Sequence, residues 1–267
     1  MKRIIVCVKP VPDPQHWHKV SMDPVTMTLK RKGIPNIINP LDKHALETAL
    51  CLREMTGTGG EVVLLSMAPP FVDATLREGL AMGADRAVLL SDRMFAGSDT
   101  LATSRVLAAG CRWIGEFDLV ILGNFSIDGS TAQVCSQLAE FLDLPNVMHV
   151  IGLECQNHGK MVVTQKIEQG YVKLEAAPPL VLAVRKELNK PRYIPFTGII
   201  EAESKEIKVL TNEDLKIEPA LIGLEGSPTK MAGLEVRQFQ RAKERLEGSI
   251  DEIVRQLADK IYQCNIT

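Results

Sequence analysis

The stretch Leu119–Val134, LVILGNFSIDGSTAQV, has the residue pattern best suited to holding a phosphorylated ligand. An aliphatic run ends at Gly123, a short polar loop follows, and Ser130 opens an amphipathic run with helical spacing. The pattern predicts a strand, a glycine turn and a helix that begins at Ser130. Because the first N–H groups of a helix attract anions, the small residues Gly129–Ala132 could cradle a phosphate or diphosphate. Many such turns in α/β folds nevertheless bind nothing.

Other chemistry-bearing patterns are missing from the sequence. The loop is neither a Walker A motif nor a G-x-G-x-x-G fingerprint. His44, His149 and His158 have no nucleophile motif beside them, and there is no paired-carboxylate signature, so no catalytic residue is predicted. The six cysteines form no C-x-x-C pair, and no metal site is predicted. We interpret them as reduced thiols in the core of a cytoplasmic protein.

Composition narrows the possible partners. A net charge of −2 and an aromatic content of 4% do not favour a nucleic-acid surface. No run reaches the roughly 18 apolar residues that a membrane span requires. The opening MKRIIVCVKP has too short an apolar run for a signal peptide, and it is interpreted as a first strand.

Strand and helix patterns alternate through the first half of the chain and must position the phosphate loop. Strands are expected at 3–8, 61–66, 87–90 and 117–122, and helices at 39–55, 72–82, 98–114 and 130–142. Four strand–helix units in succession imply a parallel sheet with helices on both faces. Ligands bind such sheets beyond the carboxyl ends of the strands. The segments 9–10, 67–68 and 123–131 lie at such ends, and the helix start 39–42 could fold over the same edge of the sheet. This convergence favours nucleotide binding.

The periodicity changes after Pro145. Antiparallel strands are expected at 147–153, 161–167 and 171–175, followed by strands at 180–184 and 207–210. A linker begins at Pro219, and the chain ends in an amphipathic helix within SIDEIVRQLADKIY. We divide the chain into an α/β domain, 1–219, and a linker with a terminal helix, 220–267. The apolar face of that helix must dock either on the same domain or on a partner chain.

Several segments, in this order, resemble the beta (small) subunit of the electron transfer flavoproteins. They are VCVKPV at 6–11, NPLD at 39–42, LREGLAMGAD at 76–85, DLVILG at 118–123, IDGSTAQV at 127–134 and ELNKPRY at 187–193. The resemblance covers nearly the whole chain. It implies a Rossmann-like α/β domain of the adenine nucleotide alpha hydrolase type, with antiparallel additions and a C-terminal helical arm.

The resemblance also implies a heterodimer with a larger alpha subunit that holds FAD. The beta subunit holds AMP in the non-bifurcating members and a second FAD in the electron-bifurcating ones. Carried over by position, the nucleotide contacts are Cys7, Lys9, Asn39, Pro40, Leu41, Asp42, Met67, Gly123, Asn124, Phe125, Ser126, Ile127, Asp128, Gly129, Ser130, Thr131, Ala132, Gln133 and Val134. These positions include the strand ends that the alternating pattern indicates.

The run IDGSTAQV is similar to the bifurcating group, so we expect FAD rather than AMP in this subunit. The resemblance then implies NADH as electron donor. It implies ferredoxin or flavodoxin as one acceptor, and an acyl-CoA dehydrogenase or lactate dehydrogenase as the other. Two alternatives remain. One is a non-bifurcating carrier with structural AMP that serves dehydrogenases and a quinone reductase. The other is a nucleotide-binding regulatory module resembling universal stress proteins.

The segment Pro191–Ile200 matches the loop by which family members recognise a dehydrogenase. By this resemblance Tyr193, Pro195 and Phe196 are partner-binding residues, with Phe196 as the apolar anchor. The alternative is that Phe196 packs on its own domain. The terminal helix is expected to embrace the alpha subunit.

Overall fold

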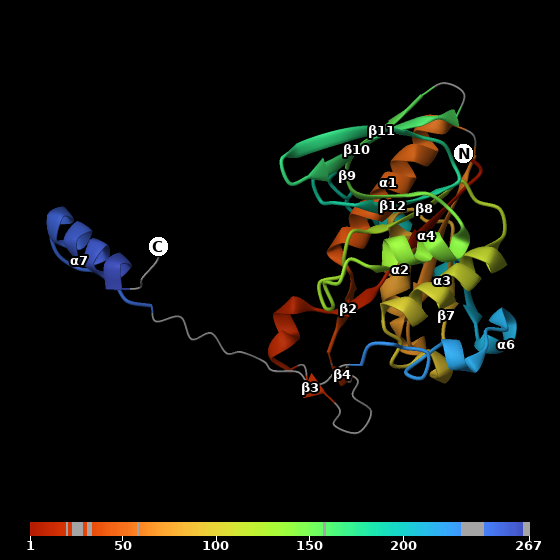
Figure 1. The fold of residues 1–267 in the computed structure, drawn as a ribbon, viewed down its shortest axis with the longest axis horizontal. Helices are drawn as coiled ribbons and strands as arrows, with labels where there is room; N and C mark the ends of the chain where they lie inside the picture. Colours follow the sequence, from red (N-terminus) through yellow and green to blue (C-terminus); the bar gives the residue numbers. More distant parts are fainter. Residues whose placement is uncertain are drawn as a thin grey trace. The chain divides into compact units, whose positions relative to one another are not determined.

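The computed structural model describes residues 1–19, 21–22, 29–30, 34–57, 59–156, 159–230 and 243–263. His158 and Cys264 therefore lie outside the described residues. The chain divides into a first unit that ends at residue 234 and a second that begins at residue 235. Figure 1 labels the elements of both units, which are described separately below.

Within the described residues, the first unit is built on a nine-stranded sheet in the order β11-β10-β9-β12-β8-β1-β6-β7-β13. The strands are β1 (Arg3–Cys7), β6 (Glu61–Met67), β7 (Arg86–Leu90), β8 (Leu119–Gly123), β9 (Asn146–Cys155), β10 (Met161–Ile167), β11 (Gly170–Ala176), β12 (Leu180–Val184) and β13 (Ile207–Leu210). All neighbours from β9 to β13 pair in parallel, whereas β10 pairs antiparallel with β9 and β11. The predicted parallel sheet with antiparallel additions is confirmed.

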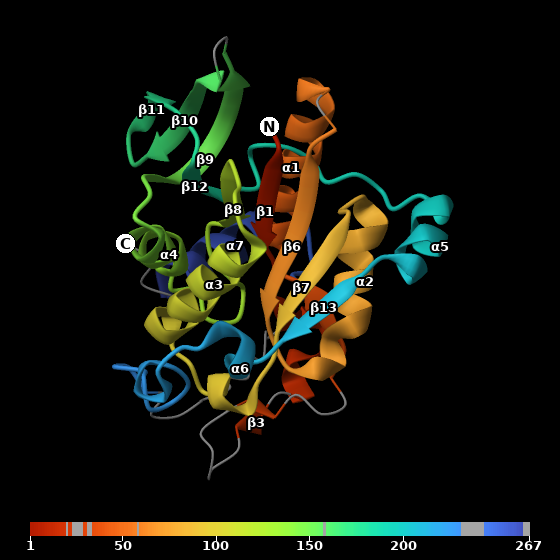
Figure 2. The same ribbon diagram turned by 90° about the vertical axis from the view of Figure 1, so that its right-hand side faces the viewer.

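Helices cover both faces of this sheet, as Figure 2 shows. The helices α1 (Pro40–Thr56) and α2 (Asp73–Met82) lie on one face, and α3 (Thr100–Ile114) and α4 (Val134–Leu142) on the other. Two apolar cores result, one between the sheet and α1–α2 and one between the sheet and α3–α4. The central strands are aliphatic on both faces because both faces are buried.

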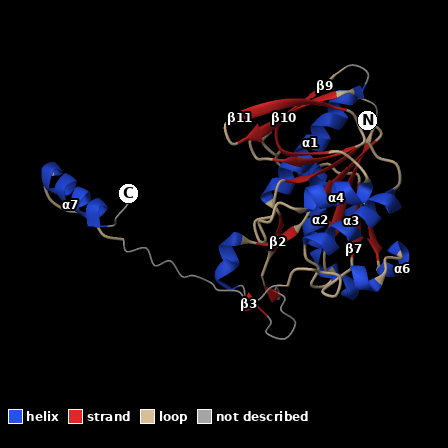
Figure 3. Ribbon diagram, in the orientation of Figure 1, coloured by secondary structure: helices blue, strands red, loops and turns tan. Residues whose placement is uncertain are grey.

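Shorter elements complete the chain and are coloured by type in Figure 3. They are β2 (Pro10–Pro12), β3 (Ser21–Met22), β4 (Leu29–Lys30), β5 (Asn36–Ile38), α5 (Phe196–Ser204), α6 (Asn212–Leu215) and 3₁₀ turns at Pro14–Lys19, Pro70–Val72, Arg93–Phe95 and Pro219–Leu221. The pair β2–β5 is antiparallel and brings the start of α1 back to the end of β1. The strand β13 adds an edge beside β7.

Two predicted boundaries are wrong. The helix expected from Ser130 begins at Val134, because Ser130 and Ala132 have φ angles of 53° and 55°, which a right-handed helix cannot contain. The segment expected as a recognition loop is helical from Phe196 onward, since α5 starts there with Pro195 as its N-cap. Proline suits this position because the first residues of a helix need no N–H partner.

The cysteines are not all in the core. Cys7, Cys111 and Cys135 are buried unpaired thiols, as predicted. Cys51 is half-buried and Cys155 is exposed, so the prediction is wrong for these two. Cys51 lies on the outer side of α1, where its thiol donates to Glu47 Oε1 at 3.2 Å.

The second unit contains α7 (Ile250–Gln263). Ser249 and Glu252 form a reciprocal capping pair at its start, in which Ser249 N donates to Glu252 Oε2 at 2.8 Å and Glu252 N to Ser249 Oγ at 3.4 Å. The predicted terminal helix is therefore confirmed, and its apolar side chains Ile250, Val254 and Leu257 are exposed. None of the helices in the described part of the chain is long and apolar enough to cross a membrane.

Candidate functional site

The sheet has its switch point between β1 and β8. After β1 the chain adds β6 and then β7 on one side of β1, and it later adds β8 on the other side of β1, with β12 beyond β8. The chain segments after β1 and β8 therefore leave from neighbouring carboxyl ends. We call this place the mouth and define it by Lys9, Asn39–Asp42 and Gly123–Val134. The structure brings these sequence-predicted segments together through the hydrogen bonds described next.

Asp42 joins three segments of the mouth. Its carboxylate is buried, and Oδ2 accepts from Lys9 N at 2.8 Å. Oδ1 accepts from Gly123 N at 3.0 Å and from Asn39 Nδ2 at 2.9 Å. Burial raises the pKa of Asp42 to about 6, although these three donors and the Lys9 charge oppose the rise. Asp42 is thus a support for the mouth, and its oxygens are already used.

Asn39 holds the loop that follows β8. Its side chain is buried, and Nδ2 donates to Phe125 O at 3.0 Å while Oδ1 accepts from Ile127 N at 3.1 Å. Gly123 allows this packing, since a Cβ at that position would lie 2.4 Å from Asp42 Oδ1. The start of α1 and the end of β8 are therefore locked together.

The loop from Ser126 to Gln133 is folded on itself. Ser130 N donates to Ser126 O at 2.8 Å, and Gly129 N donates to Asp128 Oδ1 at 2.8 Å. The amides of Gly129 and Ser130 are therefore already used within the loop. The left-handed Ala132 is followed by Gln133 in the right-handed region, and such alternation turns successive N–H groups toward one side. This backbone conformation is one that can bind an anion, and it is not helical.

Lys9 lies beside this loop. Its Nζ donates to Asp128 Oδ1 at 2.7 Å and to Ser126 Oγ at 3.3 Å. The ammonium compensates the Asp128 carboxylate, which would otherwise repel an anion at the loop. Thr100 Oγ1, in the first turn of α3, donates to Gln133 Oε1 at 2.9 Å and supports the loop from the opposite side.

Other sequence-predicted residues have different positions. The Cys7 thiol lies in the α3–α4 core, where a hydrogen bond with Cys111 and burial raise its pKa well above the usual range. Met67 packs half-buried against the same core. Asn124 is buried, and its backbone N–H donates to Val184 O at 2.9 Å. Leu41 is buried, whereas Pro40 and Phe125 are exposed.

Sequence reasoning missed Ser66. It ends the run EVVLLS one residue before Met67 and is completely buried. By strand alternation its side chain is on the α1–α2 face with Leu64. Its Oγ has no hydrogen-bond partner among the described residues. The sequence feature that could have indicated Ser66 is its single hydroxyl at the end of an otherwise aliphatic strand.

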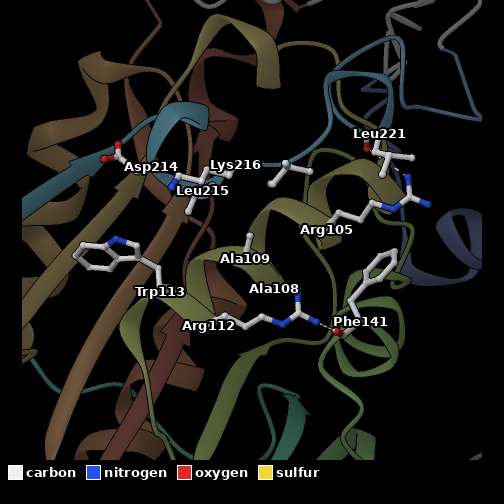
Figure 4. Close-up of a pocket in the computed structure, with 11 residues that line it drawn as sticks. Arg105, Ala108, Ala109, Arg112, Trp113, Phe141, Asp214, Leu215, Lys216 and Leu221 are labelled. Carbon is white, nitrogen blue, oxygen red and sulfur yellow. Dashed lines mark hydrogen bonds between the residues drawn. The ribbon is translucent and has the colours of Figure 1, made fainter.

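A hollow of about 590 Å³ lies on the outer side of α3 (Figure 4). It is lined by Arg105, Ala108, Ala109, Arg112, Trp113, Phe141, Asp214, Leu215, Lys216, Ile217 and Leu221. Two of its cations are engaged: Arg105 donates to Leu221 O at 3.3 Å, and Arg112 donates to Phe141 O. None of the lining residues is among Lys9, Asn39–Asp42 and Gly123–Val134, so this hollow is separate from the mouth.

A parallel sheet with an anion-binding loop at its switch point is typical of nucleotide-binding α/β proteins. The electron transfer flavoprotein domain family matches residues 26–215. The chain is 44% identical over 259 residues to electron transfer flavoprotein subunit beta of Thermoanaerobacterium thermosaccharolyticum, with 97% of each chain covered. It is 41% identical over 265 residues to caffeyl-CoA reductase-Etf complex subunit CarD of Acetobacterium woodii, with 99% of each covered. It is 40% identical over 271 residues to acryloyl-CoA reductase electron transfer subunit gamma of Anaerotignum propionicum, again with 99% of each covered.

The chain therefore belongs to the electron transfer flavoprotein family, as one of its beta subunits. Its role is electron transfer together with an alpha subunit and flavoenzyme partners.

Proposed function

We propose that this beta subunit binds FAD at the mouth and takes electrons from NADH. One electron passes to ferredoxin or flavodoxin. The other passes through the FAD of the alpha subunit to an acyl-CoA dehydrogenase or lactate dehydrogenase. The observation that carries the proposal is the loop at the switch point, in which the left-handed Ala132 is followed by the right-handed Gln133 and whose Asp128 is bound by Lys9. The names of two relatives, which belong to CoA reductase systems, support a flavoenzyme partner of this kind.

The residues of the mouth, together with Ser66 near the end of the neighbouring strand β6, fit an adenine dinucleotide. The Ser66 hydroxyl is a buried polar group without a partner among the described residues, and a nucleotide atom would satisfy it. Gly129 is exposed, and a Cβ there would meet only Ser126 Oγ at 3.7 Å, so a diphosphate can approach the backbone. When bound, the flavin supplies redox chemistry, accepting electrons in pairs and releasing them singly. The chain's own residues bind and orient it.

Structural AMP is the second candidate, because an adenylate needs only one phosphate on the same loop. The side-chain-free Gly129 favours the longer ligand, since an acidic side chain at that position would repel a second phosphate. The ligand can be identified by purifying the heterodimer with its alpha subunit, releasing the bound nucleotides by acid, and analysing them by mass spectrometry. Two FAD per heterodimer, both reduced by NADH, is the expected result. One FAD and one AMP would support the second candidate, and an empty beta subunit would overturn both.

We further propose that α5 carries the docking site for the dehydrogenase. Tyr193 is 89% exposed and Phe196 75%, and Ile199 and Ile200 are exposed beside them on α5. Arg77 Nη1 donates to the carbonyl oxygens at the carboxyl end of α5, including Lys205 O at 2.9 Å, and so fixes this helix on α2. An apolar cluster on a rigid support suits a partner-binding anchor.

Replacing Phe196 with alanine is expected to weaken dehydrogenase binding by about 10- to 100-fold, as loss of a buried aromatic anchor does. The melting temperature should not change, because the ring is exposed in the free subunit. Surface plasmon resonance with the immobilised heterodimer measures the affinity. Met55→Ala, at a 70% exposed position near the end of α1, is the control. Unchanged affinity in the Phe196 variant would place the docking site elsewhere.

A further inference from the structure

His149 has an unusual backbone within β9. Its φ angle is 54°, in the left-handed region that only glycine and a few polar residues enter readily. The pairing with β12 explains it, since Leu182 pairs with Val147 and Val184 with Val150, which leaves Met148 and His149 together opposite Ala183. This is a β-bulge. Bulges beside functional sites redirect a side chain, and strained residues cluster at such sites.

The bulge contacts both ends of the loop at the mouth. His149 N donates to Asn124 Oδ1 at 3.0 Å, and Asn124 directly follows β8. Met148 Sδ accepts from Ser136 Oγ at 3.2 Å, and Ser136 lies in the first turn of α4. The bulge is therefore adjacent to the anion-binding loop, although β9 is two strands away from β8 in the sheet.

The imidazole of His149 has a buried Nδ1 that lacks a partner among the described residues. Three other polar side chains beside the loop are engaged within the chain: Asn39 with Asp42 and the loop backbone, Asn124 with His149 N, and Lys9 with Asp128. A buried nitrogen without a hydrogen bond is costly, and folded proteins avoid it. The Nδ1 atom of His149 is therefore a buried polar atom that a ligand at the loop could satisfy.

We infer that His149 is a ligand-contacting residue whose Nδ1 hydrogen-bonds the phosphate-bearing part of the nucleotide held by the loop 124–134. The inference rests on the proposed nucleotide binding at the mouth. It explains why a histidine occupies a position whose backbone favours glycine or asparagine. The bulge places this residue next to the loop, where its backbone N–H contacts Asn124.

Substitution by glycine separates a ligand role from a structural one. Glycine adopts the left-handed conformation without strain, so His149→Gly should keep or raise the melting temperature of the heterodimer. The same change removes Nδ1. The rate at which bound nucleotide is released, measured by chase with excess isotopically labelled AMP or FAD, should rise about tenfold. This is the effect expected for loss of one hydrogen bond to a charged group. Asp143→Gly is the matched control, because Asp143 also has a positive φ of 56° but lies at the C-cap of α4.

The expected pattern is faster nucleotide release in His149→Gly without loss of stability, and wild-type release in Asp143→Gly. Wild-type release in His149→Gly would overturn the inference. If His149→Gly lowers the melting temperature, His149→Asn decides, because asparagine also accepts this backbone and its side-chain amide lies close to the position of Nδ1: slower release than in His149→Gly supports the inference, and release as fast as in His149→Gly overturns it. A wild-type heterodimer whose beta subunit holds no nucleotide would instead refute the proposed function.

Discussion

Replacing Asp42 with alanine is expected to lower the free energy of unfolding by about 3 kcal/mol or more, because each buried donor left unpaired costs about 1–3 kcal/mol. The donors are the backbone N–H groups of Lys9 and Gly123 and the side-chain amide of Asn39. Without Asp42, the ends of β1 and β8 and the start of α1 lose their common acceptor. The bound nucleotide should be lost in the same variant. Urea unfolding monitored by circular dichroism measures the stability, and mass spectrometry of the extract measures the nucleotide.

Asp42→Asn gives a sharper test, because it removes the ionisation and keeps the size of the side chain. The pKa of Asp42 is raised from 3.8 to about 6 by burial, so the folded protein holds its proton more tightly than the unfolded chain does. The contribution of this group to stability is therefore full below pH 3.8 and is lost as the pH rises through about 6. At about 1.4 kcal/mol per pKa unit, the total is about 3 kcal/mol.

The stability of the wild type minus that of Asp42→Asn should accordingly fall between about pH 3.8 and pH 6. Taking the difference cancels the carboxyl groups common to both proteins, such as Glu187, whose pKa is lowered to about 2 chiefly by Lys166. The asparagine variant should still be less stable than the wild type throughout. Its Nδ2 replaces one carboxylate oxygen, and this NH₂ group would face N–H donors that need an acceptor. Parallel curves for the two proteins would show that Asp42 is not buried as the structure places it.

The sheet could be predicted because its physical causes are local. Aliphatic strands such as EVVLLS at 61–66 must be buried on both faces, and alternation with amphipathic helices then leaves few arrangements. The convergence of Lys9, Asn39–Asp42 and Gly123 at one edge follows from the same topology. Neighbouring parallel strands end at the same edge, so polar residues at those ends must meet.

The details of the mouth depend on backbone conformations that the residue types do not indicate. Ser130, Ala132 and His149 are not residues that predict a left-handed φ, and their conformations are set by surrounding contacts such as Ser130 N to Ser126 O. Asn124 supports β9 across two strands, a contact far apart in sequence. Pairings of this kind are specified by tertiary structure, so the helix start was misplaced and neither Ser66 nor His149 was among the residues that the sequence suggested for the site.

Replacing Arg192 with methionine is expected to destabilise the first unit by about 3 kcal/mol at pH 7, because it leaves a buried carboxylate uncompensated. Arg192 Nε donates to Glu47 Oε2 at 2.8 Å, and the Glu47 side chain is only 8% exposed. Nη1 of the same guanidinium donates to Glu54 Oε1 at 2.7 Å on the next turns of α1. Arg192→Lys should lose less stability, since an ammonium keeps the positive charge. Some loss should remain, because the ammonium cannot make the guanidinium's contacts with both Glu47 and Glu54.

The loss should depend on pH in a direction that identifies its cause. Burial raises the pKa of Glu47, but the hydrogen bonds from Arg192 outweigh it and the net pKa is below 4.5. The stabilisation is therefore present above pH 4.5 and is lost as the pH falls through the lowered pKa. Unfolding of the wild type and Arg192→Met should differ most at pH 7 and converge in acid. The double variant Arg192→Met with Glu47→Leu should recover much of the stability, because an apolar pair can replace a buried ion pair.

The contacts of Arg192 with Glu47 and Glu54 also link α1 to the proposed docking site. Arg192 lies four residues before Phe196, and Asn189 fastens the preceding chain by donating to Thr48 Oγ1 at 2.8 Å and to His44 O at 3.0 Å. Since Asp42 lies in the first turn of α1, one helix supports both the mouth and the exposed α5 cluster. Arg192→Met should thus weaken dehydrogenase binding while the nucleotide remains bound, whereas Asp42→Ala should lose the nucleotide. If both variants lost both functions equally, α1 would be needed only for folding and would not position the two sites separately.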